Sequence, residues 1–148
     1  MDYRRISVSQ LEKLWQLHAA YKAAIGEEEP SGEDKERLRL AMEQERILFF
    51  GAWDGEKLAG CCSVTVGFST FNYLPSGVFE DFYIVPEYRH RGIAGKLAAY
   101  AFRESGIGTM TVGCADCDVG MYRAIGFRIP LGKLLAYEPS ENAGSASV

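Results

Sequence analysis

The sequence predicts an α/β (α+β) domain in which short apolar strands alternate with amphipathic helices. Two observations carry this prediction. Asp54-Gly55 separates the apolar runs 47–53 and 58–68, and Asp-Gly in this setting is a strong signal for an antiparallel β-hairpin. A third apolar run, 78–85, ends at a proline and is followed by glycines and an alanine-rich helical run over 93–104. The chain therefore contains a hairpin and a strand–turn–helix unit.

The first 45 residues predict one strand and two helices. Residues 3–6 form the strand. Residues 7–25 begin with a Ser-x-x-Gln capping box, show apolar side chains at helical spacing, and end before a glycine. An acidic linker, 27–30, leads to a second capped helix over 33–45, whose few apolar residues suit a surface helix.

The last third of the chain predicts a short strand, a short helix that ends at a glycine, and a closing pair of strands, over 110–114, 119–125, 127–129 and 134–137. From Pro139 onward the residues are small and polar, as in a frayed terminus. We therefore expect a single domain over residues 1–138 and a flexible tail over 139–148.

Length, composition and charge limit the classes of function that the chain can have. A chain of 148 residues is long enough for one domain with its own core. Its net charge of -4 argues against general nucleic-acid binding and is compatible with a cationic substrate. The apolar runs are too short to span a membrane, and the N-terminus leads into no signal-peptide core. We expect a cytoplasmic protein with neither a nucleic-acid partner nor a membrane partner.

Four cysteines form two pairs in the sequence. Cys61 and Cys62 are adjacent in a strand-like run, and Cys114 and Cys117 form a C-x-x-C. Adjacent strand residues point to opposite faces, so the first pair cannot easily reach one metal ion. A thioredoxin-type redox pair is expected early in the fold, whereas this C-x-x-C comes late. We expect no metal and buried, reduced thiols, with a zinc site and a redox pair as the alternatives.

The stretch that follows the third apolar run predicts an anion site. Gly92 and Gly95 allow a sharp turn and a close approach of the backbone to a ligand at the start of a helix. Arg89, His90 and Arg91 precede that helix, where positive side chains oppose its dipole. Their presence favours a phosphate or pyrophosphate ligand. The alternative is a basic turn whose glycines serve packing.

Arg89-His90-Arg91-Gly92-Ile93-Ala94 has the pattern Q/R-x-x-G-x-G/A, and 80–86 and 122–127 flank it on either side. This arrangement resembles the acetyl-CoA loop of the GCN5-related N-acetyltransferase (GNAT) superfamily. The resemblance implies a twisted, mixed, mostly antiparallel sheet that is flanked by four helices and splayed at the CoA cleft. It also implies acetyl transfer from acetyl-CoA to a primary amine of a small molecule, by direct attack in a ternary complex.

The resemblance assigns acetyl-CoA to two sets of residues. Backbone groups of Phe82 and Ile84 would pair with the pantetheine arm, and N–H groups near Phe82 would face the thioester oxygen. The pyrophosphate would lie on the loop and the first helical turn, formed by Arg89, His90, Arg91, Gly92, Ile93 and Ala94.

Two carboxylates interrupt the third apolar run. Glu80 and Asp81 are costly inside a covered strand unless they are paired or functional. Regular alternation sends them to opposite faces, but a bulge, which the family often has in this strand, would bring both towards the cleft. We expect Glu80 to be the base, acting through a water, and Asp81 to contact the substrate ammonium or support the site. The alternative is that one of them pairs with an arginine.

The resemblance also gives Tyr122 the role of proton donor to the departing CoA thiolate, with a core tyrosine as the alternative. Phe71 and Tyr73 are predicted to wall the substrate groove, or else to pack onto the helices. His18 lies on the apolar stripe of the first helix and is interpreted as a packed histidine, with a place beside the substrate pocket as the alternative.

Glu80-Asp81, with the aromatic residues Phe68, Phe71 and Tyr73 just upstream, resembles the diamine and polyamine acetyltransferase branch of the family. An acidic chain suits a polycation. Aminoglycosides and protein or peptide N-termini stay open as acceptors. A non-catalytic CoA-binding regulatory module is the alternative from another class, against which Glu80, Asp81 and Tyr122 count together. Many relatives dimerise, often through the last strands, so the partners to test are a small amine and a second copy of the chain.

Overall fold

A computed structural model describes residues 1–139 of the chain. Its strands are β1 Asp2–Ile6, β2 Ile47–Asp54, β3 Lys57–Ser69, β4 Leu74–Ile84 and β5 Thr109–Thr111. Its α-helices are α1 Leu11–Ala24, α2 Gly32–Glu43, α3 Ile93–Glu104 and α4 Val119–Ala124. Single 3-10 turns cover Val8–Gln10, Pro86–Tyr88 and Asp116–Asp118. The predicted tail lies outside the described residues, except for Pro139.

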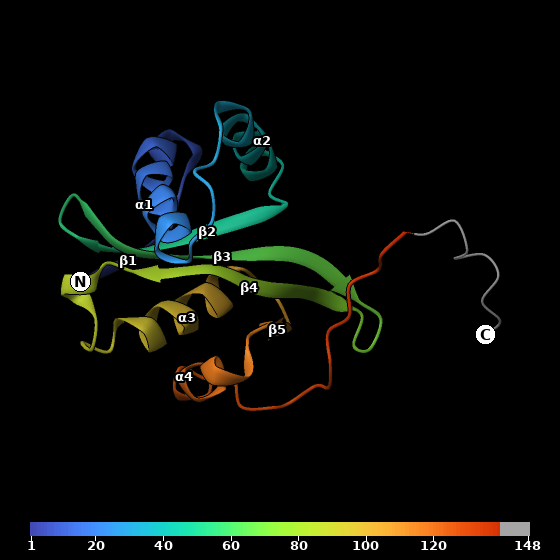
Figure 1. The fold of residues 1–148 in the computed structure, drawn as a ribbon. Coiled ribbons are helices and arrows are strands. Elements are labelled where there is room, and N and C mark those ends of the chain that lie inside the picture. The colour runs from blue at the N-terminus through green and yellow to red at the C-terminus, as the bar shows by residue number, and fades with distance from the viewer. Residues whose placement is uncertain (140–148) are drawn as a thin grey trace.

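The five strands form one sheet in the order β1-β2-β3-β4-β5. Every neighbouring pair is antiparallel except β4 and β5, which are parallel. Helices α1 and α2 lie on one face of the sheet, and α3 and α4 lie on the other (Figure 1). The predicted fold class, a mixed and mostly antiparallel sheet with four helices, is confirmed.

The two predicted capping boxes explain where the N-terminal helices begin. The Ser7 N–H donates to the Gln10 side chain at 3.0 Å. At the second helix the Ser31 N–H donates to Asp34 Oδ2 at 2.8 Å, and the Asp34 N–H donates to Ser31 Oγ at 3.1 Å. Each box satisfies N–H groups that the first turn of a helix leaves without a partner.

The core has two halves, one on each face of the sheet. Adjacent strand residues supply both, because Phe49 packs on the side of α1 and Phe50 on the side of α3. Leu14 of α1 and Leu97 of α3 are both completely buried. Burying a side chain of this size contributes about 1.5–3 kcal/mol to stability. The sheet therefore separates two apolar layers, one beneath α1 and the other beneath α3.

A β-bulge in β4 interrupts the pairing with β3. Ser63 lies opposite Glu80 and Cys61 opposite Tyr83, so β4 has one more residue than β3 in this interval. Asp81 adopts a left-handed φ of 51°, which is uncommon for a residue other than glycine. The bulge that we expected from the family resemblance is therefore present.

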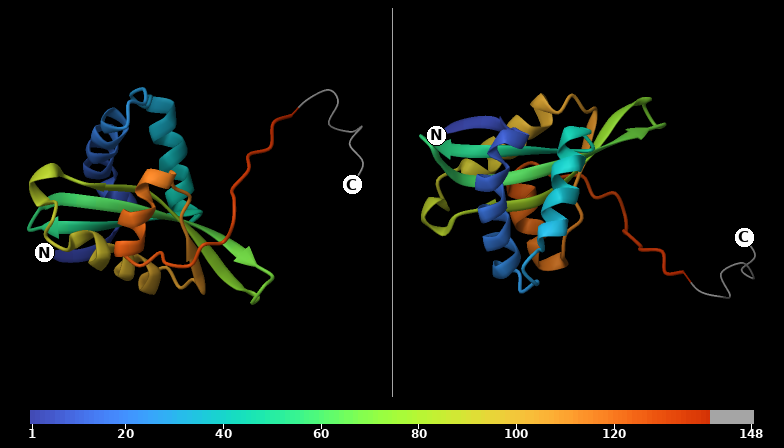
Figure 2. Two further views of the ribbon diagram at one scale, coloured as in Figure 1. Left: turned by 60° about the horizontal axis from the view of Figure 1, so that its bottom comes forward. Right: turned by 90° about the horizontal axis from the view of Figure 1, so that it is seen from above.

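The predicted closing strands, 127–129 and 134–137, are wrong for this structure, which forms no strand over residues 127–139. Pro130 has no N–H to give to a ladder, and Gly132 adopts a φ of 101°, so the apolar run is broken in the middle. The segment runs outward past the end of the sheet (Figure 2). It leaves five large apolar side chains exposed, those of Ile129, Leu131, Leu134, Leu135 and Tyr137.

The cysteines divide into two classes. Cys61 and Cys62 are buried free thiols, as predicted, and burial raises both pKa values. Cys114 and Cys117 are exposed, so the prediction of burial is wrong for this pair. The reason is that β5 ends at Thr111, earlier than predicted, and leaves both residues in the turn before α4. Among residues 1–139, no group of three or more potential ligands could hold a metal ion.

The helices of residues 1–139 are also too short or too polar to cross a membrane.

Candidate functional site

The loop between β4 and α3 forms an open cradle for an anion. Gly92 is the N-cap of α3 and has a left-handed φ of 74°, and His90 has a φ of 60°. The first turn of α3 contains no acidic residue that would compete for its free N–H groups. A Cβ atom built on Gly92 or Gly95 would meet no other atom within 4 Å. The cradle therefore has both the donors and the space that a pyrophosphate needs.

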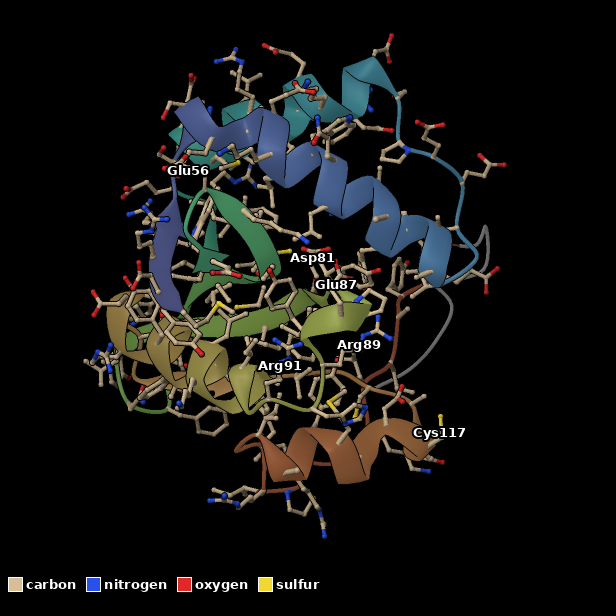
Figure 3. All side chains as sticks on the ribbon, turned by 90° about the vertical axis from the view of Figure 1, so that its left-hand side faces the viewer. Glu56, Asp81, Glu87, Arg89, Arg91 and Cys117 are labelled. Carbon is tan, nitrogen blue, oxygen red and sulfur yellow. The ribbon has the colours of Figure 1, made fainter. Side chains whose placement is uncertain are left out.

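The two arginines of the loop differ in what they contact. Arg89 donates from Nε to the Ile84 carbonyl oxygen at 2.8 Å, and its guanidinium lies 5.5 Å from the centre of the Tyr83 ring. Arg91 lies 5.3 Å from the centre of the Tyr88 ring. Figure 3 shows Arg91 on the side of α3 and α4 and Asp81 on the side of α1. Arg89 thus contacts the end of β4, whereas Arg91 contacts Tyr88 within the loop.

The cleft between β4 and β5 is splayed. The two strands pair only from Ser76 to Val78 on β4, and the rest of β4 has no β5 partner. The Val85 N–H donates to the Ala59 oxygen at 2.9 Å, towards β3. Strand alternation then turns the backbone groups of Ile84 and Phe82 to the open edge, where an extended ligand can pair with them. The Ile84 carbonyl on this edge already accepts a hydrogen bond from Arg89 Nε.

Tyr122 of α4 packs against Phe82 of β4. The two rings are 6.5 Å apart, and Phe127 packs against Tyr122 on another side at 5.9 Å. Burial raises the pKa of the Tyr122 phenol, and Tyr21, Asp118 and Cys114 raise it further. The phenol therefore keeps its proton at neutral pH and can donate it to a ligand.

Asp81 lies on the α1 side of the sheet, held by a buried serine. Ser63 Oγ donates to Asp81 Oδ2 at 2.6 Å, and Ser63 is fully buried. The Cys61 thiol approaches the Asp81 backbone oxygen at 3.5 Å. Because of the bulge, Glu80 lies on the same side as Asp81, and its side chain is exposed. Within the described residues neither carboxylate forms an ion pair with an arginine.

An aromatic row on α1 borders Asp81. The His18 ring lies 5.9 Å from Trp15 and 6.1 Å from Tyr21, and Tyr21 lies 6.1 Å from Tyr83 of β4. Burial lowers the pKa of His18, while the negative charge of Asp81 acts in the opposite direction. This arrangement places a carboxylate beside aromatic faces, as a site for an ammonium group requires.

Sequence reasoning missed several members of this cluster. It interpreted His18 as a packed histidine, with a place beside the substrate pocket as the alternative. It gave no role to Ser63, Tyr21 or Tyr83. One signal was available in the helix, since Trp15, His18 and Tyr21 are spaced by three and therefore lie on one face. No comparable signal identified Ser63, because its contact depends on the register across the bulge.

Phe71 and Tyr73 lie apart from this cluster, so their place in the wall of a substrate groove stays a prediction. Both are exposed in the turn between β3 and β4, where Phe71 has no buried surface. Tyr73 precedes Asp81 by eight residues of extended chain, or about 26 Å at 3.3 Å per residue. The reason is that β4 begins at Leu74, so the hairpin projects well beyond the helices.

The chain matches the family model described as Acetyltransferase (GNAT) domain over residues 45–129. A comparison with curated proteins found no match. Among solved structures, a probable acetyltransferase superimposes with a TM-score of 0.82 at 23% identity, covering 95% of this chain and 99% of that chain.

Two further structures carry ligands of interest. An aminoglycoside acetyltransferase from an uncultured soil metagenomic sample, in complex with sisomicin, has a TM-score of 0.80 and 19% identity over 95% of this chain and 96% of that chain. A predicted acetyltransferase from Clostridium acetobutylicum, solved with acetyl-CoA, has a TM-score of 0.74 and 14% identity over 92% and 95%. At these identities the likeness is one of fold.

Proposed function

This chain belongs to the GNAT acetyltransferase family, whose members use acetyl-CoA, and on that premise we propose that it acetylates a primary amine of a small cationic molecule by direct attack in a ternary complex. One observation carries the proposal. The bulge at Asp81 places two carboxylates on the α1 side of β4, while the open edge of the same strand leads to the anion cradle. An amine and an acetyl thioester can therefore meet across one strand.

Acetyl-CoA would be held by the groups that the fold leaves free. The first-turn amides of α3 and the Arg91 side chain would hold the pyrophosphate, and the open edge at Phe82 and Ile84 would pair with the pantetheine arm. Further backbone of the cradle comes from His90, Ile93 and Ala94. Arg89 holds the end of β4 through its hydrogen bond to the Ile84 carbonyl oxygen. The ligand supplies an acetyl group that is activated as a thioester.

The amine side requires a group that holds an ammonium ion and a group that removes its proton. Asp81 fills the first role, because Ser63 fixes one carboxylate oxygen and leaves the other for the substrate. Glu80 lies next to it on the same side and is exposed to water, so we assign it the role of base through a water molecule. Tyr122 then donates its proton to the departing sulfur, and backbone N–H groups near Phe82 stabilise the developing oxyanion.

A diamine or polyamine is the acceptor that this site suits best. The carboxylates of Glu80 and Asp81 attract one ammonium group, and the aromatic faces of Tyr21 and Tyr83 suit the methylene chain. The acidic linker that follows α1 offers charge for a second ammonium group, through Glu28 and Glu29. An aminoglycoside is the second candidate, favoured by the sisomicin complex of the similar fold.

The deciding experiment is a free-thiol assay of CoA release at pH 7.5. It would compare spermidine, 1,4-diaminobutane, an aminoglycoside and a short peptide as acceptors of the acetyl group. We expect turnover with the diamines and spermidine. Turnover with the aminoglycoside alone would mean that the acceptor is an aminoglycoside and not a diamine or polyamine. If acetyl-CoA bound but no amine were acetylated, the chain would instead be a CoA-binding module without catalysis.

We predict that Asp81→Asn raises the KM for the amine about 10- to 100-fold, because hydrogen bonds to a charged group are worth about 1.5–3 kcal/mol. The Kd for acetyl-CoA should stay unchanged, since Asp81 lies on the other side of β4. Steady-state kinetics with both substrates would measure this. Glu80→Gln is the matched comparison and should lower kcat more than it raises the KM. An unchanged KM in Asp81→Asn would remove Asp81 from the amine site.

We also propose a cytoplasmic homodimer. Ile129, Leu131, Leu135 and Tyr137 are spaced by multiples of two, as in a strand that buries one face, yet all four are exposed. A second copy would cover them with its own outward segment. Sedimentation velocity should show a dimer for the natural chain and a monomer for Leu135→Asp. A monomer in both cases would contradict the proposal.

A further inference from the structure

The turn that joins β2 to β3, residues 54–57, is held on the domain by two basic side chains. Arg4 of β1 donates from Nη2 to the Gly55 carbonyl oxygen at 3.3 Å. Lys13 of α1 donates from Nζ to the Glu56 carbonyl oxygen at 2.9 Å. The two middle residues of the turn are therefore fixed from two different elements.

The two outer residues of the same turn hold the loop between β4 and α3. The Tyr88 hydroxyl group donates to Asp54 Oδ2 at 2.8 Å. Lys57 Nζ lies 2.9 Å from Glu87 Oε1, and both side chains of this pair are exposed. Exposed ion pairs contribute little, whereas a hydrogen bond to a carboxylate is among the stronger polar contacts. The bond between Tyr88 and Asp54 is therefore the main link between turn and loop.

The ring of Tyr88 lies against Arg91 of the proposed anion cradle. The guanidinium carbon of Arg91 is 5.3 Å from the ring centre, a distance at which a cation is attracted to an aromatic face. Lys57 lies 5.0 Å from the same ring, but it is already paired with Glu87. Figure 3 labels Glu56 on the turn and Glu87 and Arg91 on the loop. A chain of contacts thus leads from Asp54 through Tyr88 to Arg91.

We propose that Asp54 and Tyr88 are positioning residues for acetyl-CoA binding, because Asp54 fixes the Tyr88 ring and the ring directs the Arg91 guanidinium towards the pyrophosphate. The inference rests on the proposed acetyl-CoA site, but it does not depend on the acceptor amine. It gives the β2–β3 turn a second role besides joining two strands.

Preorganisation of Arg91 is the physical reason for an effect on affinity. Its neighbours His90 and Gly92 both have left-handed φ values, so Arg91 does not lie in a regular element that would limit its direction. A free arginine side chain has a large conformational entropy, and a ligand that orders it must overcome this entropy. A side chain that the Tyr88 ring already holds costs the ligand less.

Calorimetry with acetyl-CoA tests the first link. Tyr88→Phe and Asp54→Ala should each raise the Kd about three- to tenfold, the change expected when one hydrogen bond is lost. The double variant should bind no more weakly than the weaker single variant, since both changes remove the same bond. Losses that multiply in the double variant, or an unchanged Kd in Tyr88→Phe, would overturn the inference.

Two comparisons separate this role from a general effect on the fold. Asp54→Asn keeps an oxygen that can accept from Tyr88, and Asn-Gly suits a hairpin turn as well as Asp-Gly does. It should therefore recover most of the affinity that Asp54→Ala loses. Tyr100→Phe removes a hydroxyl group elsewhere and should leave the Kd unchanged. No recovery in Asp54→Asn, or an equal loss in Tyr100→Phe, would contradict the proposed role.

A second cycle tests whether Tyr88 acts through Arg91. In an Arg91→Gln background, Tyr88→Phe should change the Kd by less than about twofold. The same loss with and without the guanidinium would overturn the inference. These measurements need acetyl-CoA alone, so silence of every amine in the thiol assay would contradict the proposed acetyl transfer and leave the positioning role standing. Turnover in that assay together with equal affinities in all variants would overturn only the positioning role.

Discussion

Gly92→Asp is expected to weaken acetyl-CoA binding at least about 100-fold, the change that corresponds to about 2.7 kcal/mol. Gly92 caps α3 in the left-handed region, and a Cβ atom added there would meet no protein atom within 4 Å. The new carboxylate would therefore project into the space proposed for the pyrophosphate. Repulsion between the two anions, and not a clash within the protein, is the reason for the loss. Calorimetry with acetyl-CoA would measure it.

Gly106→Asp is the matched control for this change. Gly106 follows the other end of α3 and has a φ of 68°, and a Cβ atom added there would likewise meet no atom within 4 Å. Both variants impose the same backbone cost, about 1–2 kcal/mol for a left-handed residue other than glycine. Only Gly92→Asp should lose acetyl-CoA. Equal affinities in the two variants would show that the cradle does not hold the pyrophosphate.

Tyr122→Phe should lower kcat by about 100- to 1,000-fold, within the range that a positioned general acid contributes. The ring would keep its packing against Phe82 and Phe127, so the Kd for acetyl-CoA should change by less than about twofold. The phenol is protonated at neutral pH, so it has a proton to give when the thiolate leaves. Single-turnover kinetics would separate this chemical step from binding.

Tyr100→Phe serves as the comparison for Tyr122→Phe. Tyr100 of α3 contacts Tyr3 and Phe50 and has no part in the proposed chemistry. Its loss of a hydroxyl group should leave kcat within about twofold of the natural chain. A comparable decrease in the two variants would point to a general effect on the fold, and full activity in Tyr122→Phe would remove that phenol from the mechanism.

The parts of the site that depend on local chain order were predictable from the sequence. Gly92 and the residues around it lie in one continuous segment, and a strand followed by glycines and a helix determines what its backbone can bind. The bulge at Asp81 was also expected, but only through the family resemblance. Regular strand alternation alone would have placed Glu80 and Asp81 on opposite faces.

The rest depends on contacts between distant segments. Ser63 reaches Asp81 only because one strand carries an extra residue, and Tyr21 reaches Tyr83 only through the packing of α1 on the sheet. The distance of Phe71 from Asp81 depends on the length of the hairpin between β3 and β4, which the sequence does not determine. The closing strands failed because an alternating pattern predicts a strand but cannot supply the neighbour that a strand must bond.

The extra residue in β4 also determines which face of the sheet each of the neighbouring side chains occupies. Phe79 and Phe82, three positions apart, face α3 and α4, while Glu80 and Asp81 between them both face α1. If both carboxylates stood in a strand with regular alternation, one of them would point into the aromatic layer. Deleting either Glu80 or Asp81 would therefore remove the bulge and restore regular alternation. Phe79 and Phe82 would keep their face, but a single carboxylate would be left to bind the amine and to accept its proton.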